Sequence, residues 1–264
     1  PGAGVAPVPT AAGRLGGGAR TGMLQGCVQK GLLDRVNGAT RRVLRANGYE
    51  VVEVAEQGCC GALHAHGGDL PGARELARRN IEAYEGMGLD FLAVNAAGCG
   101  AAMKEYPHLL EDDPGFRDRA VDLAEKVRDV SELLGRPGLR RGAPLDLTVT
   151  YDAPCHLLHA QGIRDDPLAL LDAIPGLTRI PLPGAEECCG GAGIYGITHP
   201  ELGGTISRDK IRAILGTGAR VVATGNPGCM MQIGAGLRMA GAPVDIAHPV
   251  ELLDESYRRG GLYP

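Results

Sequence analysis

The sequence predicts an α/β fold of two Rossmann-like lobes related by internal duplication, each a small parallel sheet with covering helices. Three observations support this prediction. Short β-prone apolar runs alternate with segments whose apolar residues have helical spacing. The eight cysteines form two sets with nearly the same spacing, and the segments that flank the two sets resemble each other. Self-similarity at a fixed interval indicates a duplication.

The cysteines give the clearest evidence of the repeat. The first four follow the pattern C-x31-CC-x38-C, and the last four follow C-x32-CC-x39-C, so corresponding cysteines lie 128 to 130 residues apart. The two sets are Cys27, Cys59, Cys60 and Cys99, and Cys155, Cys188, Cys189 and Cys229. Segments 77–99 and 207–229 align without a gap, and the copies close on the similar runs VSELL and VELL.

In the first copy the predicted elements alternate between strand and helix. The β-prone run TGMLQGC ends at Cys27, and LLDRVNGATRRVLRANG has helical spacing with a stop at Gly48. YEVVEV is predicted as a strand that leads to the CCG turn. GARELARRNIEAYEGMG is predicted as an amphipathic helix ending in glycines. LDFLAVN is predicted as a buried strand that delivers Cys99.

The second copy repeats this order. LDLTVTYDAPC is a β-prone run that ends at Cys155. A helix is predicted around 167–174, a strand at 178–182, a helix around 202–215, and a strand at 220–224 that delivers Cys229. Each cysteine then follows the carboxyl end of a strand, where open α/β sheets place their binding sites. We therefore expect the four thiols of each lobe to converge.

The domain organisation follows from the repeat. Residues 1–20 are rich in Pro, Gly and Ala without periodicity and are predicted to be a linker. The first cysteine-rich domain is predicted at 21–140 and the second at 141–264, with the boundary in the Gly/Pro/Arg-rich stretch 137–144. The first residue is Pro rather than Met and no signal peptide is evident, so we expect a fragment or a processed product.

Composition narrows the class of protein. Hydrophobic residues make up 44% of the 264 residues, which is enough for a substantial core. The net charge is −4 and no basic block occurs, which argues against nucleic acid as a partner. No apolar run reaches 18 residues, so no transmembrane segment is predicted. Without a secretion signal we expect a cytoplasmic location, where clustered cysteines indicate metal or redox chemistry before disulfides.

The glycine-rich stretch after Cys189 formally matches a dinucleotide-binding loop at residues 191–196. Such a loop should directly follow a strand, and here the cysteines and PGAEE intervene. A disulfide within either CC pair would need a strained eight-membered ring. Metal binding is the remaining interpretation, and zinc and iron–sulfur clusters both use cysteine thiolates. The long spacings favour an iron–sulfur cluster. Four nearby histidines are candidate ligands or hydrogen-bond donors: His64, His66, His156 and His159.

Four motifs carry a resemblance to a known family: QGCCGALHAHGG, VNAAGCGAAMKEYPHLL, ECCGGAGIYGITHPEL and TGNPGCMMQIGAGL. They resemble the cysteine-rich CCG family, which includes the glycolate oxidase iron–sulfur subunit, the lactate-utilisation iron–sulfur protein and the cysteine-rich subunit of heterodisulfide reductase. The resemblance covers roughly 21–257. The chain departs from the family in two ways. It lacks the ferredoxin-like C-x2-C-x2-C-x3-C-P runs, and no fifth cysteine follows Cys99 or Cys229 at the C-x2-C spacing.

The resemblance implies an iron–sulfur electron-transfer subunit of a flavin-dependent 2-hydroxy-acid (glycolate) dehydrogenase. All eight cysteines would be ligands, with one [4Fe–4S] cluster per lobe or zinc in one lobe, and no catalytic residue would lie on this chain. FAD would lie on a partner subunit, a ferredoxin-like domain or subunit would assist, and quinone or another acceptor would take the electrons. The complex could hold the chain at the inner face of the membrane. The alternatives are a lactate-utilisation protein, a heterodisulfide-type thiol–disulfide reductase subunit and a zinc-stabilised interaction module.

Overall fold

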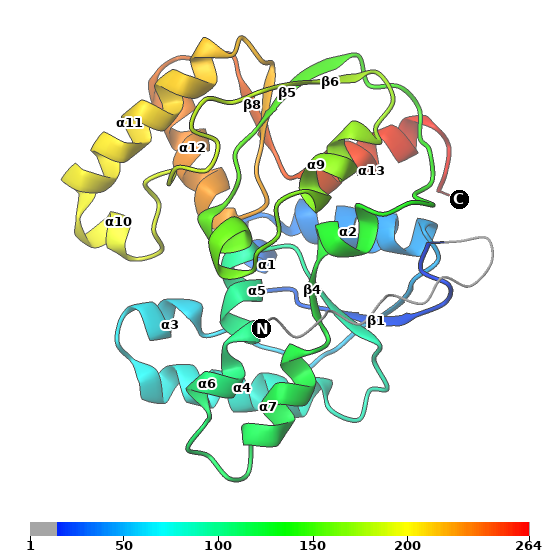
Figure 1. Ribbon diagram of the computed structural model, residues 1–264, viewed down its shortest axis with the longest axis vertical. Helices are drawn as coiled ribbons and strands as arrows, with labels where there is room; N and C mark the ends of the chain where they lie inside the picture. The colour runs from blue at the N-terminus through cyan, green and yellow to red at the C-terminus, as the bar shows by residue number, and fades with distance from the viewer. Residues whose placement is uncertain (1–14, 264) are drawn as a thin grey trace.

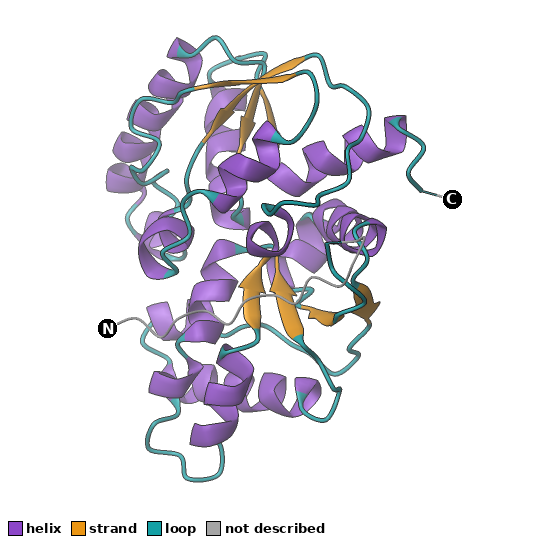
Figure 2. Ribbon diagram, turned by 45° about the vertical axis from the view of Figure 1, so that its right-hand side comes forward, coloured by secondary structure: helices purple, strands orange, loops and turns teal. Residues whose placement is uncertain are grey.

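The computed structural model describes residues 15–263 as two α/β lobes, each built on a four-stranded parallel sheet (Figures 1 and 2). The first sheet has the order β2-β1-β3-β4 and the second the order β6-β5-β7-β8, so the two lobes share one topology. The strands are β1 (Arg20–Met23), β2 (Glu50–Val52), β3 (Phe91–Val94), β4 (Val127–Asp129), β5 (Leu147–Tyr151), β6 (Leu177–Ile180), β7 (Val221–Ala223) and β8 (Asp245–Ala247). The predicted α/β fold of two similar lobes is confirmed.

Helices connect and cover these strands. In the first lobe they are α1 (Cys27–Leu32), α2 (Asp34–Ala46), α3 (Ala62–His66), α4 (Leu70–Tyr84), α5 (Ala97–Lys104), α6 (Tyr106–Leu109), α7 (Arg117–Ala124) and α8 (Val130–Leu134). In the second they are the π-helix η1 (His156–Ala160), α9 (Asp166–Asp172), α10 (Tyr195–Thr198), α11 (Pro200–Gly216), α12 (Pro227–Met239) and α13 (Pro249–Arg259). Each predicted helix and strand has a counterpart. The sequence did not predict strands β4 and β8, the longer helices α5, α7, α12 and α13, or the short helices α1, α3, α6, α8, η1 and α10.

The two sheets pack on opposite sides of a shared layer of helices. Helices α2 and α8 of the first lobe and α9 and α13 of the second lie between the sheets (Figure 2). Because neighbouring residues of a strand point to opposite faces, Phe91 and Ala93 join this shared core while Leu92 packs against the outer helices of its own lobe. The run 221–223 alternates in the same way between the shared core and the outer core of the second lobe.

Polar contacts also join the lobes across the shared layer. Arg42 on α2 donates two hydrogen bonds to the Asp254 carboxylate on α13, at 2.9 and 2.7 Å. The buried Tyr257 hydroxyl donates to the Arg140 carbonyl at 2.7 Å.

Of the predicted linker 1–20, residues 1–14 lie outside the described part of the chain, and Leu15 is buried in the shared core. The connection 135–146 contains neither helix nor strand.

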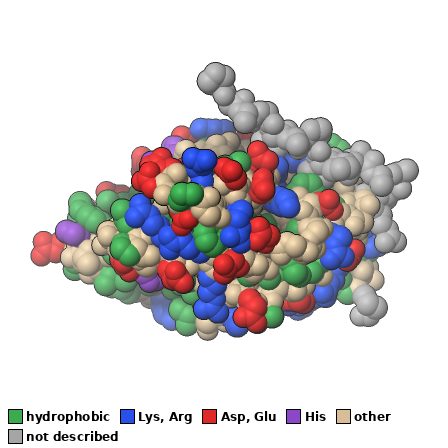
Figure 3. Space-filling model, turned by 90° about the horizontal axis from the view of Figure 1, so that it is seen from below, with side chains coloured by type: hydrophobic (Ala, Val, Ile, Leu, Met, Phe, Trp, Pro, Cys, Tyr) green, Lys and Arg blue, Asp and Glu red, His purple; other side chains and the backbone are tan. Residues whose placement is uncertain are grey.

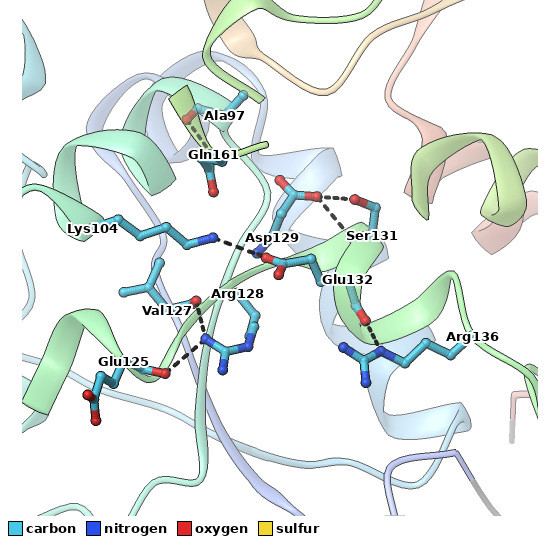
Figure 4. Close-up of polar contacts among 10 residues, drawn as sticks. All are labelled: Ala97, Lys104, Glu125, Val127, Arg128, Asp129, Ser131, Glu132, Arg136 and Gln161. Carbon is cyan, nitrogen blue, oxygen red and sulfur yellow. Dashed lines mark hydrogen bonds and ion pairs between the residues drawn. The ribbon is translucent and has the colours of Figure 1, made fainter. Parts of the chain in front are cut away.

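A buried polar cluster lies where β4 passes into α8 (Figure 4). The Asp129 carboxylate accepts hydrogen bonds from the Ser131 amide at 2.8 Å and the Ser131 hydroxyl at 2.5 Å. The Glu132 carboxylate accepts from the Asp129 amide at 2.8 Å and from Lys104 on α5 at 3.2 Å. Asp129 and Glu132 therefore form a reciprocal capping box that starts α8 and ties it to α5.

The surface shows no gathering of one charge on the face at the lower end of Figure 1. Basic and acidic side chains are interspersed there (Figure 3), and several form ion pairs, including Arg78 with Asp113 and Arg119 with Glu85. None of the helices within residues 15–263 combines the length and the apolar character needed to cross a bilayer.

Candidate metal centres

The parallel strands place the outer cysteine of each motif at the start of a helix. Cys27 opens α1 after β1, and Cys155 directly precedes η1 after β5. Cys99 and Cys229 each occupy the third position of a helix, α5 or α12. Because unpaired backbone N–H groups give a helix N-terminus partial positive charge, these positions favour thiolates or an anionic metal cluster.

The four thiols of the first set meet as expected from the strand order. The Sγ atoms of Cys27 and Cys59 lie 3.5 Å apart. The thiols of Cys59 and Cys60 influence each other's pKa, as do those of Cys60 and Cys99, so the four side chains lie in one group. Cys27 is exposed and Cys60 is buried, so the set extends from the surface into the lobe.

The second set has the same connectivity and is more buried. The Cys189 thiol donates to the Cys229 sulfur at 3.2 Å, and Cys188 contacts both Cys155 and Cys189. Cys189 and Cys229 are both buried. The Gly190 amide donates to the Cys188 sulfur at 3.3 Å. Backbone N–H groups aimed at sulfur are the contacts that tune iron–sulfur centres.

The glycine of each CCG turn is required by the backbone conformation. Gly61 has φ +82° and Gly190 has φ +85°, values that residues with a Cβ rarely adopt. A Cβ at Gly190 would also lie 2.4 Å from the Gly203 carbonyl oxygen on α11. The turns therefore fold tightly enough to place both cysteines of each pair beside the outer ones.

A neutral residue on α4 holds the first turn. The Asn80 side chain accepts a hydrogen bond from the Gly58 amide at 2.9 Å and donates to the Cys59 carbonyl at 2.8 Å. It also donates to the Tyr106 hydroxyl at 3.1 Å, which in turn donates to the Cys60 carbonyl at 2.9 Å. Asn80 is fully buried, so a connected polar network inside the lobe holds the turn in place.

A charged residue has the corresponding place in the second lobe. Lys210 on α11 occupies the position that aligns with Asn80. Its ammonium donates to the Gly184 carbonyl at 2.8 Å and pairs with the Asp152 carboxylate at 2.9 Å; both side chains are 1% exposed. The Thr224 hydroxyl donates to the same carboxylate at 3.0 Å.

Asn80, Asp152 and Lys210 were not predicted as site residues from the sequence. The sequence did hold one indication of Asn80 and Lys210. They are polar residues at aligned positions of the two amphipathic helices, on the face that packs inward.

Hydrogen bonds between the thiols, together with burial, shift the pKa values of several cysteines. Hydrogen bonds from Cys155 and Cys189 lower the pKa of Cys188, and the Gly190 amide and the Lys210 charge lower it further. A hydrogen bond with Cys188 raises the pKa of Cys155, and burial raises the pKa of Cys27. Since a metal binds thiolates, loading either set must release the thiol protons.

A cavity of about 450 Å³ lies between the lobes. All four cysteines of the first set line it, together with second-lobe residues that include Ile194 and Met231. His66 and His156 also line this cavity, and their rings approach from the two lobes to a centroid distance of 5.5 Å. His156 Nδ1 lies 3.5 Å from the Cys155 sulfur.

Of the other two candidate histidines, His64 lies on α3 and His159 on η1, and neither bonds a cysteine within the described hydrogen-bond network. Among residues 15–263, no three His, Cys, Asp or Glu side chains are arranged as they would be around a single metal ion. The thiols instead form a chain of pairwise contacts in each lobe.

Two segments of the chain match the same known domain family. The model of the CCG cysteine-rich domain family matches residues 21–104 and again residues 149–234. The chain belongs to the CCG cysteine-rich domain family. Each match encloses one complete four-cysteine set, so the duplication inferred from the spacing coincides with two copies of the family's domain.

Relatives of this chain include glycolate oxidase iron-sulfur subunits and lactate utilization proteins. It is 36% identical over 245 residues to the probable glycolate oxidase iron-sulfur subunit of Bacillus subtilis, covering 90% of this chain and 54% of the relative. It is 32% identical over 241 residues to the glycolate oxidase iron-sulfur subunit of Escherichia coli, covering 90% and 58%. It is 31% identical over 240 residues to lactate utilization protein A of Oceanobacillus iheyensis, covering 89% and 96%. The chain thus spans little more than half the length of the two glycolate oxidase relatives.

A solved structure shares the fold. A hypothetical protein from Helicobacter pylori superposes with a TM-score of 0.65 at 8% identity, covering 90% of this chain and 49% of that chain. At this identity the likeness shows the architecture alone.

Proposed function

We propose that the chain is the iron–sulfur electron-transfer subunit of a flavin-dependent 2-hydroxy-acid dehydrogenase of the glycolate oxidase type. The observation that carries the proposal is the convergence of four thiols in each lobe at the carboxyl ends of parallel strands. One centre would be held by Cys27, Cys59, Cys60 and Cys99, and the other by Cys155, Cys188, Cys189 and Cys229.

The residues fit a [4Fe–4S] cluster in each lobe. Four thiolates are the usual ligand set of such a cluster, which supplies one-electron transfer when bound. The chain contributes helix N-termini behind Cys99 and Cys229, and an amide directed at the Cys188 sulfur. These groups favour negative charge at the sulfurs and so support an electron-accepting centre. Zinc in one lobe is the alternative occupant.

The wider assignment rests on the named relatives. A partner subunit carrying FAD would oxidise the hydroxy acid, and its electrons would pass through this chain to quinone or another acceptor. A ferredoxin-like domain or subunit would complete the path, and the complex would lie in the cytoplasm or at the inner face of the membrane. Within this chain, 21–140 and 141–264 would each form one cysteine-rich domain.

The interlobe cavity favours a second candidate, reduction of a small disulfide beside the first thiol set. The cavity is lined by all four thiols of that set and is large enough for a small molecule. Turnover of a disulfide by the isolated chain supplied with reduced viologen as the electron donor, lost on Cys59→Ala, would support this candidate. Absence of turnover by the metal-loaded chain would leave the electron-transfer role alone.

Metal analysis of the anaerobically purified chain tests the main proposal. We expect a brown protein that contains iron and acid-labile sulfide, and we expect Cys60→Ala and Cys189→Ala each to lose about half of the iron. Met239→Ala is the matched control because that side chain is 90% exposed on α12. A colourless wild-type chain that contains zinc and no iron would show instead a zinc-stabilised interaction module.

A further inference from the structure

The two thiol sets differ in the charge buried beneath them. In the second lobe the buried Lys210–Asp152 pair contacts the Gly184 carbonyl, in the segment that leads into the turn that carries Cys188 and Cys189. In the first lobe the aligned positions hold Asn80 and, by the spacing from the leading cysteine of each set, Leu24. Both of these are buried and neutral.

A structural role alone does not account for this pair. Burying two charges carries a desolvation penalty that their mutual attraction offsets only with good geometry, and neutral replacements are often as stable. The first lobe holds its turn with the neutral Asn80, through hydrogen bonds to the Gly58 amide and the Cys59 carbonyl. The first lobe therefore shows that this fold can hold a CCG turn in place without an ammonium group.

The position of Lys210 indicates what the charge does. Its ammonium donates to the Gly184 carbonyl, four residues before Cys188, and pairs with Asp152, three residues before Cys155. Its charge also lowers the pKa of the Cys188 thiol. Asp152 and its partner Thr224 fix the ammonium in place, because the carboxylate bonds both groups. A positive charge in this dry location interacts strongly, since solvent does not screen it.

We propose that Lys210 is a positioning residue of the second thiol set, where its buried charge stabilises the reduced, more negative state of the bound centre and makes the two centres electrostatically unequal. This inference rests on the proposed iron–sulfur function. It concerns the second lobe only, because Asn80 brings no charge to the first.

Redox titration followed by electron paramagnetic resonance tests the inference. Cys60→Ala provides a background in which the second centre is the one retained. In that background we compare Asp152→Asn, Lys210→Met and the double variant. Lys210→Met should lower the equilibrium constant for reduction of the centre about tenfold. This is a fall in the reduction potential of about 59 mV for a one-electron couple. Asp152→Asn should shift the potential upward, and the double variant should return toward the starting value.

Opposite signs for the two single variants are the decisive readout, because general structural damage would shift both in the same direction. Asp152→Asn keeps the size of the side chain and a hydrogen-bonding oxygen, so it gives a result even if Lys210→Met does not fold. Unchanged potentials, or shifts of the same sign, would overturn the inference. Loss of all iron from the Cys60→Ala background would also overturn it, whereas a wild-type chain without iron would overturn the proposed function itself.

Discussion

Replacing Asp129 with Asn should stabilise the protein at neutral pH. The Asp129 side chain caps α8 while 3% exposed, and burial raises the pKa of its carboxyl group from the ordinary value of 3.8 to about 6. Hydrogen bonds from Ser131 oppose this rise but do not cancel it. Asn is as good an N-cap residue as Asp and carries no charge.

The sign and size follow from linkage. Because the folded state binds this proton more tightly than the unfolded state, the free energy of unfolding falls as pH rises from about 4 to about 6. Each tenfold change in proton affinity is worth about 1.4 kcal/mol, so burial of the carboxylate costs about 3 kcal/mol above that window. This net shift already includes the hydrogen bonds from Ser131. The Asp129→Asn variant keeps an oxygen that can accept them, so the gain should be about 3 kcal/mol at neutral pH.

Urea denaturation of wild type and Asp129→Asn at about pH 5 and about pH 8 measures the effect. The gain of the variant over wild type should be about twice as large at the higher pH, because a pH of about 5 lies inside the window in which the carboxyl group titrates. Asp118→Asn is the control for removal of a carboxylate, since that side chain is 91% exposed and should show no such dependence. If Asp129→Asn lost the same free energy at both pH values, the carboxylate would be contributing more through its hydrogen bonds than burial costs, and the reasoning would be wrong.

Three further features are tested by substitution. Asn80→Ala should reduce the free energy of unfolding by about 3 kcal/mol, because buried groups of the first turn lose their partners, and iron analysis should show loss from the first centre alone. Gly61→Ala should cost about 1–2 kcal/mol in thermal unfolding, through its positive φ. Gly190→Ala should cost more, because the added Cβ would also meet the Gly203 carbonyl; equal losses would contradict this close approach. Tyr257→Phe should cost about 1 kcal/mol in urea denaturation, since its hydroxyl bonds the Arg140 carbonyl across the lobe interface.

The cysteine arrangement could be predicted from the sequence because its determinants are local. Each apolar run that formed a central strand ended close to a cysteine, and parallel strands bring their carboxyl ends to one edge. Strands β4 and β8 were missed because each has three residues and includes charged ones, and so lacks an apolar run. Helices α5 and α12 begin around Cys99 and Cys229, in segments whose Gly and Pro residues have low helix propensity.

The supporting residues of the site could not be derived from one sequence. Asn80 and Lys210 occupy aligned positions, but which face of α4 or α11 meets a turn depends on how the helix packs against its sheet. The shared core was likewise hidden, because an apolar residue such as Val43 has the same helical spacing whether it meets its own sheet or the other lobe. Only the packing distinguishes the two.

The shared core between the sheets has a consequence for electron tunnelling. Tunnelling rates fall steeply with the separation of donor and acceptor, so centres on two hinged domains would exchange electrons at a rate that varied with every opening. Here Val43 of α2 and Leu253 of α13 lie in one close-packed layer, and such interiors have low compressibility. If the two thiol sets hold the proposed clusters, this shared core would act as a fixed spacer, which sets the distance between them once, at folding, rather than anew at each transfer.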